Sequence, residues 1–90
     1  MNGTIYKTDG KTVDIEIDET DNILCLETLR NAVSGYIEVV RLFDRHLIIN
    51  EEGKLFNLPY NPFSKQLTKG TRYEGADFFG DVVLLNGFLD

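Results

Sequence analysis

Long apolar runs are missing from this 90-residue sequence. The longest uninterrupted apolar stretches, residues 23–26 and 82–85, have four residues each, whereas a membrane-spanning helix needs about 20. The first residues, Met1-Asn2-Gly3-Thr4, also lack the basic and apolar regions of a secretory signal. We therefore expect an intracellular protein that does not span a membrane.

Cysteine and histidine occur once each, as Cys25 and His46. One cysteine cannot close a disulfide within the chain, and one Cys with one His cannot supply the usual set of nitrogen and sulfur ligands of a zinc site. Cys25 falls beside a predicted apolar helix face, where a thiol packs as a small hydrophobe. We expect no catalytic residue, no bound metal and no cofactor. A small hydrolase, which would need His46 close to a carboxylate, is the third hypothesis for function.

Basic residues are outnumbered, with 9 Lys and Arg against 15 Asp and Glu, which gives a net charge of −6. This charge disfavours direct binding of nucleic acid or of an anionic membrane surface. The charges are unevenly spread, because five of the eight residues from 14 to 21 are acidic. Residues 53–73 contain no acid and carry four bases: Lys54, Lys65, Lys69 and Arg72. Each block is either a solvated surface or a binding surface.

The sequence opens with two β-rich segments that predict a hairpin around an Asp-Gly turn: residues 4–7 and 12–17. Two registers are open for this hairpin. A two-residue turn would pair Tyr6 with Val13, whereas a turn with a glycine bulge would pair Ile5 with Val13.

A helix should begin near Ile23, because residues 20–22 (Thr20, Asp21 and Asn22) are all candidate N-caps. Gly35 is a candidate C-cap. The helix has one broad apolar stripe, which we expect to face the core. That stripe comprises Ile23, Cys25, Leu26, Leu29, Ala32 and Val33.

The second half of the chain predicts three further strands and one more helix. Residues 36–50 predict a hairpin that turns at Asp44-Arg45, and residues 82–85 predict a strand covered on both faces, because they are apolar throughout. Asn61-Pro62 has the pattern of a helix start, a cap followed by proline.

Two shorter features lie between that hairpin and that helix. Gly53 is placed in a tight turn where we expect a positive φ angle. Residues 54–56 predict a short strand. The sequence as a whole therefore predicts an α+β fold: a single compact domain over residues 1–90, with element order ββ-α-ββ-α-β and a mixed sheet with two short helices.

Three sequence blocks resemble the family DUF3846, a domain of unknown function found in small proteins of phages, plasmids and conjugative elements. The blocks are Gly35-Tyr36-Ile37-Glu38-Val39-Val40, Asn50-Glu51-Glu52-Gly53-Lys54-Leu55 with Leu58-Pro59-Tyr60-Asn61-Pro62, and Gly80-Asp81-Val82-Val83-Leu84-Leu85. The resemblance implies an accessory protein of a mobile element, located in the cytoplasm of a bacterial host. It implies no reaction, substrate or catalytic residue.

The basic block predicts a site for a small phosphate-bearing ligand at the start of the second helix. Unpaired N–H groups near Phe63 and Ser64, together with the positive end of the helix dipole, would bind an anion. Lys65 would add a charge, and the ring of Tyr60 could stack on a base. The candidate ligand-binding residues are Tyr60, Asn61, Phe63, Ser64, Lys65, Lys54, Lys69 and Arg72. The alternative is that the two aromatic rings belong to the core and the lysines only solubilise a short helix.

The acidic block predicts a second surface, because Asp14, Glu16 and Asp18 alternate with apolar residues along one strand. This row is either a solvated face or a mimic of regularly spaced phosphates that would bind a host protein.

The leading hypothesis for function is a non-enzymatic accessory protein that sequesters a small, nucleotide-like anion and so counteracts or modulates a host system. An acidic inhibitor of a host defence protein is the alternative. Exposed strand edges in so small a sheet also allow a homodimer.

Overall fold

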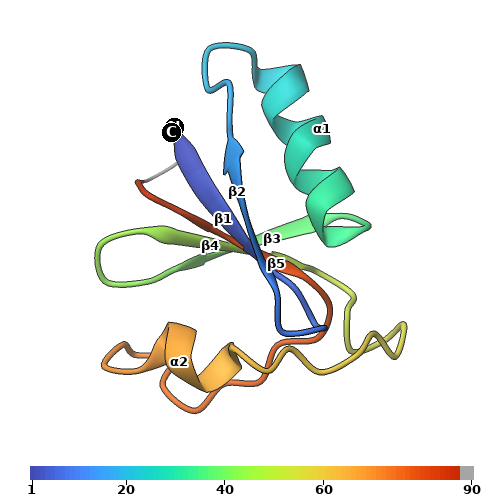
Figure 1. Ribbon diagram of the computed structural model, residues 1–90, viewed down its shortest axis with the longest axis vertical. Coiled ribbons are helices and arrows are strands. Elements are labelled where there is room, and N and C mark those ends of the chain that lie inside the picture. The colour runs from blue at the N-terminus through green and yellow to red at the C-terminus, as the bar shows by residue number, and fades with distance from the viewer. Residues whose placement is uncertain (88–90) are drawn as a thin grey trace.

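A five-stranded sheet organises the chain in the computed structural model, which describes residues 1–87 (Figure 1). Within this range the elements are β1 (Asn2–Tyr6), β2 (Thr12–Glu16), α1 (Asn22–Val33), β3 (Ile37–Arg41), β4 (His46–Asn50), α2 (Ser64–Thr68) and β5 (Val82–Leu85). The predicted α+β fold and its order ββ-α-ββ-α-β are confirmed. Residues 88–90, the end of the predicted domain, lie outside the described residues.

The strands lie in the order β2-β1-β5-β4-β3, and each neighbouring pair in the described sheet is antiparallel. The predicted mixed sheet is therefore wrong. Strands β2 and β3, which α1 connects, run in the same direction but lie at opposite edges of the sheet, so they never pair. Strand β5 returns between β1 and β4 and runs antiparallel to both. A homodimer through either edge strand stays a prediction.

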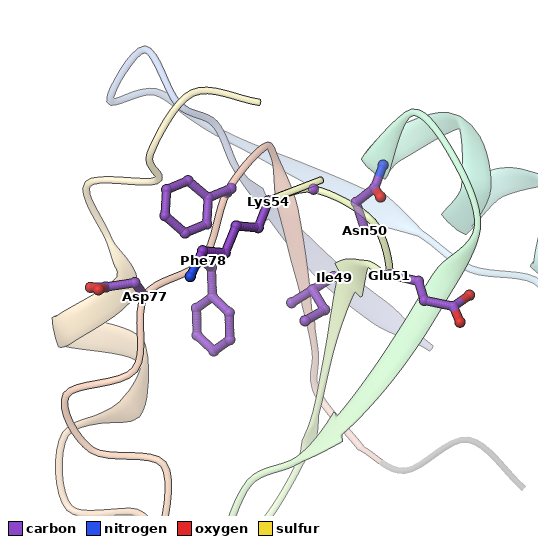
Figure 2. A pocket seen from close by; sticks show the side chains of 8 residues that line it. Ile49, Asn50, Glu51, Lys54, Asp77 and Phe78 are labelled. Atoms are coloured by element: carbon purple, nitrogen blue, oxygen red, sulfur yellow. The ribbon is translucent and has the colours of Figure 1, made fainter. Parts of the chain in front are cut away.

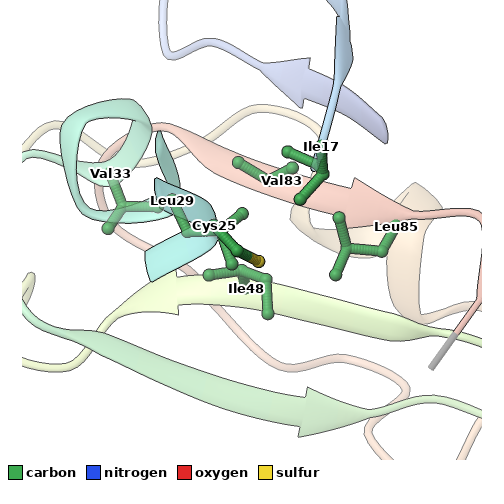
Figure 3. Close-up of a cluster of buried hydrophobic side chains, with 7 residues drawn as sticks. All are labelled: Ile17, Cys25, Leu29, Val33, Ile48, Val83 and Leu85. Carbon is green, nitrogen blue, oxygen red and sulfur yellow. The ribbon is translucent and has the colours of Figure 1, made fainter. Parts of the chain in front are cut away.

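Both faces of the sheet are covered, with α1 on one side and α2 on the other (Figure 1). Val83 and Leu85 of β5 pack on the α1 side, and Val82 packs on the other side, which confirms the strand predicted to be covered on both faces. The core beneath α1 comprises Ile17, Cys25, Leu29, Val33, Ile48, Val83 and Leu85 (Figure 3). The opposite core comprises Val40, Leu42, Leu47, Phe78 and Val82.

The first hairpin adopts the register with a glycine bulge. Ile5 pairs with Val13 and Tyr6 pairs with Thr12. Gly10 has a φ angle of 88°, which a glycine adopts without the strain that a side chain would cause. Its N–H donates to the Lys7 carbonyl at 3.0 Å and closes the turn.

Helix α1 begins as predicted but is rotated relative to the expected stripe. The Asp21 carboxylate accepts hydrogen bonds from the N–H groups of Ile23 and Leu24 at 3.1 and 3.0 Å. Ile23, however, is 74% exposed, so its assignment to the core is wrong. It lies two residues, about 200° around the helix, from buried Cys25. The buried row is Cys25, Leu29 and Val33, spaced four residues apart.

Two glycines have roles other than those predicted, since each allows a close approach. Ser34, rather than Gly35, takes the left-handed conformation at the end of α1, with φ 63°. A Cβ on Gly35 would lie 2.7 Å from the Asn50 amide nitrogen. Gly53 is not among the residues with positive φ, but a Cβ there would lie 2.4 Å from the Phe79 carbonyl oxygen. A larger residue at position 35 would collide with the Asn50 side chain, and one at position 53 would collide with the Phe79 backbone.

The short strand predicted at residues 54–56 is wrong, because this segment forms consecutive turns. The N–H of Phe56 donates to the Glu52 carbonyl and that of Leu58 donates to the Gly53 carbonyl, each at 3.0 Å. These local bonds use backbone groups that a strand would need for its neighbour.

Candidate functional site

Asn61 holds the segment before α2 from inside the protein and is fully buried. Its amide nitrogen donates to the carbonyls of Tyr6 and Gly80 at 2.8 and 3.0 Å. Its amide oxygen accepts from the Phe63 N–H at 2.9 Å, and its carbonyl accepts from the Ser64 N–H at 3.1 Å. The N–H groups of Phe63 and Ser64 therefore already donate to internal acceptors, so the prediction that they are unpaired is wrong.

Ser64 and Phe63 also serve the packing of this segment. The buried Ser64 hydroxyl donates to the Asn61 carbonyl at 2.7 Å and accepts from the Phe78 N–H at 2.9 Å. The Phe63 ring lies edge-on to the Tyr6 ring, with 4.9 Å between their centroids. Asn61, Phe63 and Ser64 thus connect α2 to β1 and to the segment before β5.

Three more of the predicted residues, Lys65, Tyr60 and Lys54, gather around Asp77, an acid outside the predicted set. Lys65 Nζ lies 2.6 Å from the Asp77 carboxylate and 2.7 Å from the Gly75 carbonyl. The hydrogen bond from Lys65 lowers the pKa of Asp77, and Tyr60 and Lys54 act in the same direction. The same contact raises the pKa of Lys65. The two cations, Lys65 and Lys54, therefore already have Asp77 as a counterion.

A hollow of about 360 Å³ lies beside this cluster, between the turn after β4 and residues 77–79. Figure 2 shows the Lys54 side chain extending toward the segment that carries Asp77, while the Glu51 carboxylate points away from it. Two carboxylates, Glu51 and Asp77, line the hollow against one lysine. This balance of charge does not favour an anion.

Two adjoining hollows, with volumes of about 270 and 240 Å³, lie between the β3–β4 hairpin on one side and α2 with the segment after it on the other. Tyr6 of β1 and Leu84 of β5 also line the first. Leu42 and Thr71 line both. We name the two together the hairpin groove. The residues that line it include Arg41, Phe43, Asp44, Arg45, Lys69, Gly70, Thr71 and Arg72.

Positive charge dominates the hairpin groove. Arg45 and Lys69 line the first hollow, and Arg72 and Arg41 line the second. The one carboxylate among the lining residues is Asp44, whose two oxygens accept from Arg45 Nε at 3.1 Å and from its terminal nitrogen at 3.2 Å. This contact lowers the pKa of Asp44 and raises that of Arg45. The groove therefore combines four cations and one acid in a protein of net charge −6.

Lys69 and Arg72 of the predicted ligand-binding set line this groove, whereas Arg41 and Arg45 were missed. The missed residues come from a hairpin that lies far from the basic block in the sequence. The sequence does contain an indication of these two residues, because bases also cluster in residues 41–46.

The family model described as "Domain of unknown function (DUF3846)" matches residues 1–88. The chain belongs to the DUF3846 family. The match starts at the first residue and so extends beyond the three blocks that carry the resemblance. Comparison with curated proteins and with solved structures found no significant match. The function of this DUF3846 domain must therefore be argued from its own residues.

The acidic row of this DUF3846 domain is shorter than predicted. Strand β2 ends at Glu16, so Asp18 lies two residues beyond the end of the strand. The Asp18 carboxylate instead accepts from the N–H and hydroxyl of Thr20 at 3.0 and 2.6 Å. Glu16 lies 3.1 Å from the N-terminal ammonium of Met1. Only Asp14 and Glu16 remain on one face of the strand.

The single thiol and the single imidazole are both buried. The Cys25 side chain points from α1 into the core beneath the helix, where burial raises the pKa of the thiol. His46 pairs with Arg41 across β3 and β4, and burial together with the Arg41 charge lowers the pKa of the imidazole. Neither residue lines the hairpin groove.

Among the residues that the structure describes, no group of three or more His, Cys, Asp or Glu side chains could hold a metal ion. No helix in the same part of the chain is both long and apolar enough to cross a bilayer.

Proposed function

We propose that this DUF3846 protein is a non-enzymatic binding protein that sequesters a small, nucleotide-like anion in the hairpin groove. The observation that carries this proposal is the meeting of Arg45, Lys69 and Arg72, from two separate segments, around adjoining hollows. Together the hollows reach the range of about 300 to 1,000 Å³ that is typical of small-molecule sites. Arginine guanidinium groups are suited to phosphate because they donate two parallel hydrogen bonds.

The biological setting that we propose is a phage or other mobile element in a bacterial cytoplasm. There the protein would counteract or modulate a host system by withdrawing a phosphate-bearing molecule. The resemblance of the sequence blocks to proteins of such elements supports this setting. The acidic surface around Asp14 and Glu16 is the alternative if no phosphate compound binds.

Reversing the charge of the groove should abolish ligand binding. A ligand at 100 times its Kd stabilises a protein by about 2.7 kcal/mol, which raises the Tm of a domain of this size by roughly 10 to 20 °C. We expect such a shift in a thermal screen of pyrophosphate, nucleoside mono-, di- and triphosphates and cyclic dinucleotides. The variant Lys69→Glu/Arg72→Glu should lose it.

The matched control for that experiment is Lys11→Glu/Lys54→Glu, which changes the total charge equally but outside the groove. Both control residues are exposed, so the unliganded Tm should change little. The control should keep most of the ligand-induced shift. A shift that persists in Lys69→Glu/Arg72→Glu, or one lost equally in both variants, would contradict the proposed site.

Removing the acid in the groove should strengthen binding. Asp44→Asn keeps the shape of the side chain but removes the charge that pairs with Arg45. A unit charge about 4 Å away contributes about 1 kcal/mol in water, so we expect the affinity for the ligand to rise about 5-fold. Calorimetric titration measures this change. An unchanged or weaker affinity would show that Arg45 does not contribute to the site.

A further inference from the structure

We infer that the ligand of the hairpin groove is a nucleotide whose base stacks on Phe43, at the tip of the β3–β4 hairpin. This inference rests on the proposed function and names its ligand class. Phe43 is 92% exposed, the highest value among the large hydrophobic residues that the structure describes, and it lines the same hollow as Arg72. Covering an aromatic ring that is exposed to water with another flat ring lowers the free energy of the complex.

The hairpin fixes the backbone that carries this ring. The Leu42 N–H donates to the Arg45 carbonyl at 2.9 Å, so the turn that carries Phe43 is closed. The neighbouring Leu42 side chain is buried in the core on the α2 side. Because Leu42 fills that core and the turn is tight, the next residue is presented to solvent at the groove.

A second residue that lines this hollow leaves room for a flat group to approach. Gly70 lines the hollow, has a φ angle of 80°, and has no atom within 4 Å of the place where a Cβ would lie. Bare backbone therefore borders open space at this point. Arg72 lines the same hollow, and its guanidinium lies over the Tyr73 ring, 5.4 Å from the ring centroid. An aromatic residue, bare backbone and a cationic residue around one hollow suit a base joined to phosphate, whereas a simple phosphate would use only the cation.

Tyr60, the stacking residue predicted from sequence, is less suitable. Its ring lies edge-on to Phe79 with 5.9 Å between centroids, and it helps to lower the pKa of Asp77 rather than lining the hairpin groove. We therefore assign the stacking role to Phe43 and not to Tyr60.

Single-stranded nucleic acids also stack on exposed aromatic rings, but the net charge of −6 opposes a polyanion much more than one nucleotide. The two hollows, of about 270 and 240 Å³, also match one small ligand. We therefore assign the groove to a small nucleotide and not to a polymer.

The test compares nucleotides with base-free analogues of similar charge. Calorimetric titrations would use the four ribonucleoside 5′-monophosphates against ribose 5-phosphate, and ATP and GTP against inorganic tripolyphosphate. Stacking should make at least one nucleotide bind about 5- to 150-fold more tightly than its analogue. Phe43→Ala should remove this preference and leave the affinity for the analogue unchanged, while Phe43→Tyr should keep the preference. Because Phe43 is exposed, both variants should fold normally, which their unliganded melts would verify.

The outcomes separate the two proposals. If no compound binds, the proposed function fails and this inference fails with it. If each nucleotide binds no better than its analogue and Phe43→Ala changes neither, sequestration of an anion stands and base stacking is overturned. If a single-stranded oligonucleotide binds more tightly than every small nucleotide, the assignment to a small ligand is overturned.

Discussion

Replacing Asn61 by alanine should lower the free energy of unfolding by about 3 to 5 kcal/mol. The change removes three hydrogen bonds of a fully buried side chain and leaves the carbonyls of Tyr6 and Gly80 and the N–H of Phe63 without that partner. Buried polar groups without a partner cost about 1 to 3 kcal/mol each. Since these groups join α2 to β1 and to the entry of β5, the whole domain should be affected.

Urea denaturation measures this loss, and Asn31→Ala is the matched control. Asn31 lies exposed on α1, where alanine is a better helix former, so the control should change stability by less than about 1 kcal/mol. A loss below about 1 kcal/mol for Asn61→Ala would show that this residue does not hold the segment before α2 as described.

Leu29→Ala should destabilise the domain by about 3 to 5 kcal/mol. Leu29 is 1% exposed at the centre of the core beneath α1 (Figure 3), and truncation leaves a cavity between the helix and strands β4 and β5. Ile23→Ala on the same helix is the matched control, because Ile23 is 74% exposed. We expect a change below about 0.5 kcal/mol for the control. Similar losses for the two variants, or a larger one for Ile23→Ala, would contradict the orientation of α1.

Local patterns were enough to predict most of the elements. An Asp-Gly turn predicted the first hairpin, the run of four apolar residues predicted a strand covered on both faces, and Asp21 was among the predicted caps. What the patterns left open depended on tertiary packing. The rotation of α1, for example, depends on which side chains pack against β4 and β5. A stripe of six apolar residues does not determine that rotation, because it is too broad.

Asn61 illustrates why the candidate site was only partly predictable. An asparagine followed by proline has the same local pattern whether it caps an exposed helix or is buried. The acceptors that decide between these roles, the carbonyls of Tyr6 and Gly80, lie on distant segments. The basic residues of the predicted site fall into two groups for the same reason. Lys65 is paired with Asp77 only after folding, whereas Lys69 and Arg72 line the hairpin groove.

The hairpin groove is a product of tertiary structure. It forms because the β3–β4 hairpin lies next to the segment after α2, so that Arg45 and Lys69 line one hollow. The basic block correctly included Lys69 and Arg72, yet its charge alone did not distinguish a groove from a solvated surface. Asp77, whose carboxylate neutralises the other end of that block, follows the acid-free stretch by only a few residues.

The central claim, that the hairpin groove binds a phosphate-bearing ligand, is tested most directly by the amide spectrum of ¹⁵N-labelled protein. The protein would be titrated with pyrophosphate and with the nucleotide that gives the largest thermal shift. We expect dose-dependent shifts of the amides of residues 42–45 and 69–72, with little change at 50–54 and 77–79. Shifts confined to 50–54 and 77–79, or no shifts at millimolar ligand, would contradict it.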